Sequence, residues 1–306
     1  MNISKCLAAV GACVLSLLSA CGGGTSQLEA FVPDRLLVFG DEHSVFTTEG
    51  RKYSVNALSA EGALDCENHP LWIQSVAAVY NYRFAQCLGT ATESRAITYA
   101  VPGATVAGVR SQIDAQAATF TTKDLVLVMA GLHDVLEVYA ARSTTDTEAQ
   151  LLERARERGA ALGAEVNRMV ALGARVVVAT MPDVGLSPWA LAKGTADAAL
   201  LSRLSGAFNG RVRVTILNDG RFVGLVLADE LLQSAVQVPL AYGLSNVTTA
   251  VCAEAAPLPN CTSATPSLIT GGDPNGYLWA DSLRFGPTIH LQMGLVAASR
   301  ARSNPF

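Results

Sequence analysis

The stretch Leu36-Leu37-Val38-Phe39-Gly40-Asp41-Glu42-His43-Ser44 predicts a buried strand that stops abruptly and then presents polar side chains. Four consecutive apolar residues suit a strand that is covered on both faces, and Gly40 permits a sharp turn of the backbone. Ligands of open parallel sheets collect at the carboxyl ends of the strands. We therefore expect the side chains of residues 41–44 to lie at the mouth of any site.

Similar apolar runs recur along the chain and alternate with segments of helical periodicity. The expected strands cover residues 36–40, 97–101, 125–129, 175–180 and 212–217. The expected helices cover residues 70–80, a segment ending at 113, a long segment ending near 173, and residues 196–208, 222–233 and 288–299. Thr145 and Glu148 have the spacing of a capping box for the long helix, whereas residues 235–277 are expected to be rich in loops. This alternation predicts a parallel sheet with helices on both faces.

Composition narrows the classes of function. The chain has 306 residues, half of them apolar, and a net charge of −4 without a basic tract. Its length is sufficient to bury a large core. A nucleic-acid partner is not expected, because such proteins carry a concentrated positive charge.

The first twenty residues have the pattern of a targeting segment. Lys5 precedes an apolar run that is too short to span a membrane. Leu18-Ser19-Ala20-Cys21 resembles a bacterial lipobox, which implies a signal peptide over residues 1–20 and a lipid on Cys21. Residues 21–33 then form a flexible tether. The resemblance implies a membrane partner through the anchor and a cell-envelope location. The absence of Asp after Cys21 favours the outer membrane, and a plain secretory signal is the alternative.

Four cysteines remain in the mature chain, and an even number in an oxidising compartment indicates disulfides. They are Cys66, Cys87, Cys252 and Cys261. Four cysteines permit three pairings, and proximity in sequence favours Cys66 with Cys87 and Cys252 with Cys261. Zinc is the competing interpretation, but the chain has no Cys-x-x-Cys spacing. No metal or cofactor is expected.

Sequence blocks along nearly the whole mature chain resemble those of the SGNH/GDSL hydrolases, in particular a branch of lipases and autotransporter esterases. They comprise residues 39–44, 99–105, 131–134, 180–188, 242–247 with Cys252, and 279–284, after which Pro287-Thr288 stand two residues late. Each block alone is weak evidence for the fold of this family, but all the blocks together and in this order are strong evidence for it. The resemblance implies one three-layer α/β/α domain over residues 34–306, with a flavodoxin-like fold and a parallel sheet of about five strands. It also implies an acyl-ester or other small-molecule ligand and a site built by these blocks.

Three of the implied catalytic positions carry unusual residues. Gly103 matches the backbone oxyanion donor of the family, and Asp281 matches its orienting carboxylate. Glu42, however, stands at the position of the nucleophilic serine, His133 at that of the asparagine, and Arg284 at that of the histidine base. A guanidinium stays protonated and cannot act as a general base.

These substitutions favour a catalytically degenerate protein that acts as a binding or structural module. We expect Glu42 and Arg284 to form an ion pair, with Asp281 on the other side of the guanidinium and the carboxylate against Gly103 and His133. The alternative is an active esterase or lipase-like hydrolase with a non-standard catalytic set. Ser44 as nucleophile and His290 as base are the secondary candidates for such a set.

Overall fold

A parallel five-stranded sheet organises the chain in the computed structural model, which describes residues 31–88, 93–217 and 220–303. The predicted signal peptide and Cys21 lie outside these residues. The sheet consists of β1 (Arg35–Gly40), β4 (Ala96–Thr98), β5 (Asp124–Met129), β6 (Arg175–Ala179) and β7 (Val223–Val226). Its spatial order is β4-β1-β5-β6-β7, and every neighbouring pair is parallel.

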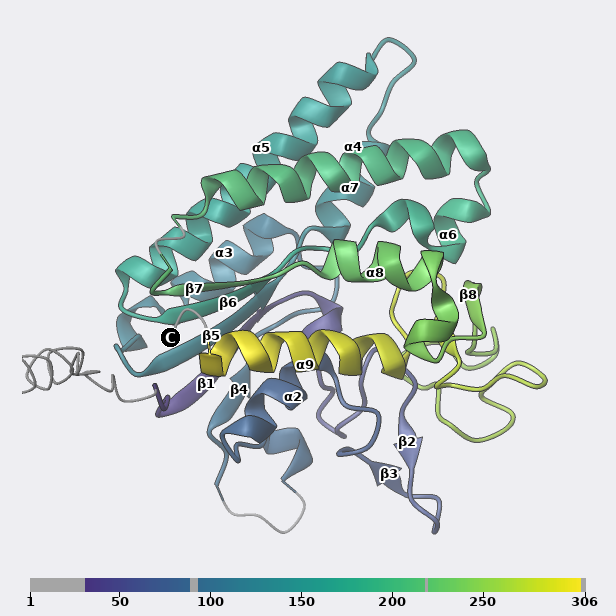
Figure 1. The fold of residues 1–306 in the computed structure, drawn as a ribbon, viewed down its shortest axis with the longest axis horizontal. Helices are drawn as coiled ribbons and strands as arrows, with labels where there is room; N and C mark the ends of the chain where they lie inside the picture. The colour runs from purple at the N-terminus through teal and green to yellow at the C-terminus, as the bar shows by residue number, and fades with distance from the viewer. Residues whose placement is uncertain (1–30, 89–92, 218–219, 304–306) are drawn as a thin grey trace, which may run out of the picture. The chain divides into compact units, whose positions relative to one another are not determined.

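Helices cover both faces of the sheet (Figure 1). One face carries α2 (Trp72–Val79) and α9 (Pro287–Ser303), which contact each other, and α9 also contacts β6 and β7. The other face carries α3 (Val106–Asp114), α4 (Leu132–Ala140), α5 (Glu148–Ala171) and α7 (Thr195–Thr215). The predicted three-layer α/β/α architecture with a parallel sheet is confirmed.

The shorter elements lie mainly in the connections between strands and helices. They are η1 (Glu42–Ser44), β2 (Ala57–Leu58), β3 (Leu64–Asp65), η2 (Ala85–Cys87), η3 (Ala117–Thr119), η4 (Val184–Leu186), α6 (Pro188–Leu191), α8 (Ala228–Gln237), η5 (Pro239–Tyr242), β8 (Asn246–Ala250) and β9 (Tyr277–Trp279). Among the described residues, no helix has both the length and the apolar character needed to cross a membrane.

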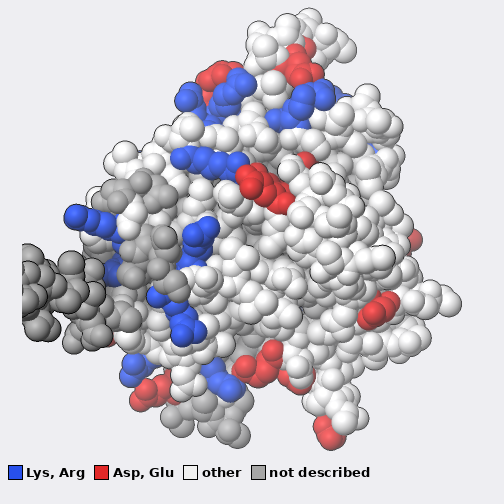
Figure 2. Space-filling view, in the orientation of Figure 1, with Lys and Arg blue, Asp and Glu red and all other residues white. Residues whose placement is uncertain are grey.

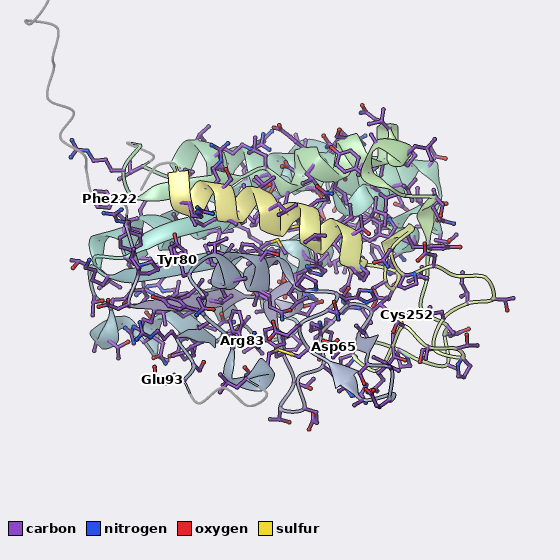
Figure 3. All side chains as sticks on the ribbon, turned by 60° about the horizontal axis from the view of Figure 1, so that its bottom comes forward. Asp65, Tyr80, Arg83, Glu93, Phe222 and Cys252 are labelled. Carbon is purple, nitrogen blue, oxygen red and sulfur yellow. A yellow bond between two sulfur atoms is a disulfide. The ribbon has the colours of Figure 1, made fainter. Side chains whose placement is uncertain are left out.

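The cysteines pair as proximity in sequence predicted. Cys66 bonds to Cys87 across a Cα–Cα distance of 5.4 Å, and Cys252 bonds to Cys261 across 5.9 Å. The first bond ties the segment before α2 to η2. The second closes a short loop in the irregular segment between β8 and β9, where Figure 3 labels Cys252.

The predicted strand at residues 212–217 is wrong, because α7 continues through Thr215. Leu201, Leu204, Phe208 and Val212 are all fully buried, and they recur at helical spacing along one face. Val214, by contrast, is 73% exposed on the opposite side. The fifth strand is instead β7, which lies inside the segment predicted as a helix at residues 222–233, and α8 follows it.

The predicted capping box is shifted by two residues. Thr147 caps α5, and its Oγ1 accepts a hydrogen bond from Gln150 N at 3.3 Å while Gln150 Oε1 accepts one from Thr147 N at 2.8 Å. Thr145 lies in the preceding turn, which is held by a hydrogen bond from Ser143 N to Asp146 Oδ2 at 2.8 Å. Both threonines are followed three residues later by Glu or Gln, as a capping box requires. Because Thr145 lies in the turn, the helix begins after Thr147. A separate helix, α4, precedes α5.

Candidate functional site

The candidate site lies where β1 and β5 end, next to each other in the centre of the sheet. In order of their appearance along the chain, the main strands are arranged 2-1-3-4-5, and the order reverses between the first and the third. Crevices in such sheets form at this reversal. The segment after β1 supplies Glu42, the segment after β5 supplies His133, and the loop before α9 supplies Arg284.

Gly40 makes the turn from β1 into η1. Its φ is +143°, and a Cβ at this position would lie 2.1 Å from the Met129 carbonyl oxygen in β5. The Gln112 side chain from α3 holds the turn, because it accepts from Gly40 N at 2.9 Å and donates to Gly40 O at 3.0 Å. The close approach of two neighbouring strand ends therefore requires glycine here and sets the direction of Glu42.

The carboxylate of Glu42 is fully buried and is surrounded by hydrogen-bond donors. Gly103 N donates to Oε2 at 2.9 Å, and His133 Nε2 lies 2.8 Å from the same oxygen. Arg284 Nε donates to Oε1 at 2.9 Å, and Arg284 Nη2 lies equally close to that oxygen. The expected Glu42–Arg284 ion pair is thus present, together with the expected contacts to Gly103 and His133.

Asp281 holds the other side of the guanidinium. Its Oδ2 accepts from Arg284 Nη1 at 2.8 Å. Its Oδ1 accepts from the backbone N–H groups of Leu283 and Arg284 at 2.8 and 2.7 Å. The loop before α9 is therefore closed on itself, which fixes Arg284 over the Glu42 carboxylate.

The contacts in this cluster shift its pKa values in opposite directions. Burial alone raises the pKa of Glu42, but the hydrogen bond from His133 and the charges of His43, His133 and Arg284 outweigh it and hold that pKa well below its usual range. Burial lowers the pKa of His133, but the Glu42 carboxylate reverses the effect and the net shift is upward. The arrangement is a charge network with Glu42 ionised at its centre.

Such a network is poorly suited to nucleophilic attack. Glu42 has no exposed surface, and both of its oxygens already accept hydrogen bonds. A nucleophile needs access to the substrate and an adjacent base. The two charged side chains that contact Glu42 are the Arg284 guanidinium, which stays protonated, and His133, whose pKa is raised. The geometry instead provides a charged surface above the buried Glu42 carboxylate. On this surface about a fifth of the His133 side chain and a quarter of the Arg284 side chain are exposed.

The neighbours of Glu42 lie deeper than the sequence indicated. The side chains of residues 41–44 were expected at the mouth of a site, but all of them are buried. Asp41 Oδ1 lies 2.9 Å from His43 Nδ1 and also accepts from His43 N, which makes Asp41 the cap of η1. Because η1 coils directly after the strand, these residues are packed inside the domain rather than exposed at its edge.

The two secondary candidates do not approach Glu42 as a catalytic set would. Ser44 is buried, and its Oγ accepts from Trp72 Nε1 at 3.0 Å. His290 is fully buried in α9, with its ring 5.7 Å from that of Phe285 and 6.2 Å from that of His43. Neither ring nitrogen of His290 has a hydrogen-bond partner among the described residues.

Two supporting residues were missed in the sequence. Gln112 lies on α3, 72 positions from the turn that it holds, and nothing in its local pattern indicates that contact. Lys52 is buried, and its ammonium donates to the carbonyl oxygens of Asn68 and His69 at 2.7 and 2.8 Å. Burial lowers the pKa of Lys52 to about 8. Among the described residues, no three His, Cys, Asp or Glu side chains are grouped so as to hold a metal ion.

No protein-family model matches the chain, and no curated protein matches it. It is similar in structure to a member of the lipolytic G-D-S-L family from Veillonella parvula, with 11% identity and a TM-score of 0.44 over 86% of this chain and 95% of that one. It is also similar to an acetylxylan esterase from Geobacillus stearothermophilus, with 14% identity and a TM-score of 0.44 over 89% and 94% of the two chains. A third similar structure is an alpha/beta hydrolase from the metagenome of Lake Arreo, Spain, with 15% identity, a TM-score of 0.44 and coverages of 89% and 98%.

Proposed function

We propose that this chain is a lipid-anchored cell-envelope protein of the SGNH/GDSL type that has lost ester hydrolysis and acts as a binding or structural module. The observation that carries this proposal is the state of Glu42. The residue at the position of the nucleophile is buried, ionised and bound on both oxygens, and its charged neighbour Arg284 cannot accept a proton.

The motif blocks support the family assignment, and their order matches the order of the segments around the site. Residues 39–44, 99–105, 131–134 and 279–284 are far apart in sequence but supply the contacts to Glu42. The lipobox-like Leu18-Ser19-Ala20-Cys21 supports the anchor and hence a cell-envelope location, with the outer membrane favoured. A ligand would meet the exposed edges of His133 and Arg284, so a small molecule with an anionic or acyl group fits best.

The proposal is tested by restoring the family residues. Wild type is expected to show neither turnover nor an initial burst with activated short-chain esters. Glu42→Ser/Arg284→His is expected to gain measurable turnover, and adding His133→Asn is expected to increase it, because an amide donor to the oxyanion is worth about 10²–10³ in rate. The measurement is release of the chromogenic alcohol, and the two single variants are the matched controls.

The opposite pattern would overturn the proposal. Turnover by wild type that disappears in Glu42→Gln would assign carboxylate chemistry to the site, and loss in Ser44→Ala would assign a serine nucleophile. Circular dichroism of every variant establishes that a loss of activity does not result from unfolding.

A further inference from the structure

One edge of the sheet carries a concentration of positive charge. Each of its five strands begins with, or is preceded within two residues by, an arginine or lysine. These residues are Arg35 for β1, Arg95 for β4, Lys123 for β5, Arg175 for β6 and Arg221 for β7. Because the strands are parallel, all five residues come to the same, amino-terminal edge.

The last turn of α9 adds Arg300 and Arg302 to this edge. Tyr80 at the end of α2 holds that turn, because its hydroxyl donates to Ala301 O at 2.7 Å. Figure 2 shows blue Lys and Arg atoms gathered at this end of the face that carries α9, while the surface over the rest of α9 and over α8 is largely uncharged. We call this surface, made of the five residues before or at the strands together with Arg300 and Arg302, the basic edge.

Three of the seven residues of the basic edge are without a nearby carboxylate in the part of the chain that the structure describes. Among the residues that the structure describes, no carboxylate lies within ion-pair distance of Lys123, Arg300 or Arg302. Arg35 is paired with the buried Asp124 at 2.7 Å, and Arg95 reaches Glu93 only at 4.0 Å. Elsewhere most exposed arginines have a close partner, as Arg154 does with Asp146 at 2.6 Å. The chain as a whole has a charge of −4, so the basic edge opposes the overall balance.

The N-terminal segment enters the domain at the same edge. Pro33 O accepts a hydrogen bond from the Tyr82 hydroxyl, and Asp34 N donates to Lys123 O at 2.9 Å. The chain then enters β1 at Arg35. The described chain therefore enters the sheet beside Lys123 and Arg95, whose carbonyl oxygens accept from Asp34 N and Leu36 N at 2.9 and 2.7 Å.

From this placement we infer that the basic edge docks on an anionic lipid surface. Guanidinium groups pair with headgroup phosphates, and each Lys or Arg near an anionic leaflet adds about 1 kcal/mol of attraction. The inference rests on the proposed lipid anchor at Cys21, which would hold the domain near the membrane surface. Residues 21–30 of the tether predicted for residues 21–33 would span about 17 Å on average. A tether of this length would allow the basic edge to come within the Debye length of about 8 Å from the leaflet.

Docking in this way determines which end of the protein faces away from the bilayer. The candidate site lies at the carboxyl ends of the strands, opposite the basic edge. Figure 3 labels Phe222, directly before β7, and Cys252, in the loops of the carboxyl edge, and shows them at opposite ends of the domain. The exposed edges of His133 and Arg284 would then face the aqueous phase, where a soluble or cell-wall-borne ligand reaches them.

The test measures partition of the full chain onto vesicles. Phosphatidylcholine vesicles are compared with vesicles that also contain phosphatidylglycerol, and the ratio of the two partition coefficients isolates the basic edge, because an N-terminal lipid inserts into both. Wild type is expected to favour the anionic vesicles about tenfold or more at low salt, and the preference is expected to disappear at high salt.

A matched pair of variants locates the effect. Arg95→Gln/Arg300→Gln/Arg302→Gln is expected to lose most of the preference. Arg154→Gln/Arg156→Gln/Arg203→Gln removes the same charge from α5 and α7 and is expected to keep it. Binding to the neutral vesicles reports the anchor separately, so the two proposals fail independently.

Three outcomes would overturn the inference. Wild type that partitions equally onto both kinds of vesicle has no docking edge for anionic lipid. Equal losses in the two triple variants would show a general charge effect. Tight binding to a duplex oligonucleotide without preference for anionic vesicles would assign the basic edge to nucleic acid instead.

Discussion

Three segments that are distant in sequence supply the hydrogen bonds that hold the Glu42 carboxylate, through Gly103, His133 and Arg284. A buried carboxylate without partners would cost several kcal/mol or become protonated. Here two positive groups and a backbone N–H surround it, which explains why its pKa falls despite burial. The same network that prevents attack by Glu42 also ties together the ends of β1, β5 and the loop before α9.

Glu42→Ala tests this role in stability. The substitution leaves Arg284 and a charged His133 without their central partner, and breaking a buried pair costs about 3–5 kcal/mol. We expect a loss of about 3 kcal/mol in the free energy of unfolding, because both cations are partly exposed. The measurement is urea denaturation, with Glu49→Ala, at an exposed glutamate, as control. A loss below about 1 kcal/mol, the usual value for a surface pair, would contradict the proposed network.

At the scale of elements, the junction of β1 with η1 shows why one glycine is required. Gly40 combines a positive φ with a position directly against the Met129 carbonyl. The backbone of β5 cannot move away, because it is paired with β1 on one side and β6 on the other. The turn that sets the direction of Glu42 is thus a property of two adjacent strands.

Gly40→Ala is expected to destabilise the protein by at least about 3 kcal/mol, because the new methyl group would overlap a backbone oxygen that is fixed in the sheet. Gly62→Ala is the matched control. Its φ is also positive, at +81°, but no atom lies within 4 Å of the added Cβ, so only the backbone strain of about 1–2 kcal/mol applies. Thermal or urea unfolding measures both, and equal losses would refute the steric explanation.

In the molecule as a whole, the charged and titratable groups lie in three places: the amino edge of the sheet, its carboxyl edge and the interior. The amino edge is basic, whereas the carboxyl edge carries the Glu42 network. His290, on α9, is fully buried, and its ring nitrogens have no hydrogen-bond partner among the described residues. Burial, together with the charges of His43 and Lys52, holds the pKa of His290 well below its usual 6.5.

The lowered pKa of His290 makes the free energy of unfolding decrease at acidic pH. The unfolded chain takes up a proton below pH 6.5, but the folded chain does not, so stability falls as the pH drops below 6.5. The slope is about 1.4 kcal/mol for each pH unit. We expect wild type to lose more stability than His290→Leu between pH 6.5 and 5, by up to about 2 kcal/mol.

His133→Gln is the control of opposite sign for this experiment. The pKa of His133 is raised, so its contribution is present below pH 6.5 and is lost as the pH rises through the folded value. The advantage of wild type over His133→Gln should therefore grow as the pH falls. Urea denaturation at a series of pH values measures both differences, and parallel curves for wild type and His290→Leu would refute the assignment.

The elements differ in how far their sequence predicted them. Continuous apolar runs bounded by glycine or proline identified β1, β5 and β6, because a fully covered parallel strand has few other compositions. Residues 212–217 have the same local appearance, but α7 continues through Thr215, and its buried face, which includes Val212, packs against α5. The start of α5 was also not determined by local sequence, because Thr145 and Thr147 both have the spacing of a capping box and only Thr147 caps the helix.

The sequence by itself determined the class of the fold, the pairing of the cysteines favoured by proximity, and the identity of the charged residues that meet around Glu42. These depend on local pattern, on short separation, or on residue types at motif positions. Only the tertiary structure decided that residues 41–44 are buried, that Gln112 holds the turn at Gly40, and that basic residues before five strands form one edge. Each of these depends on which strands lie side by side, and parallel pairing across distant segments brings together residues whose local sequence carries no record of the contact.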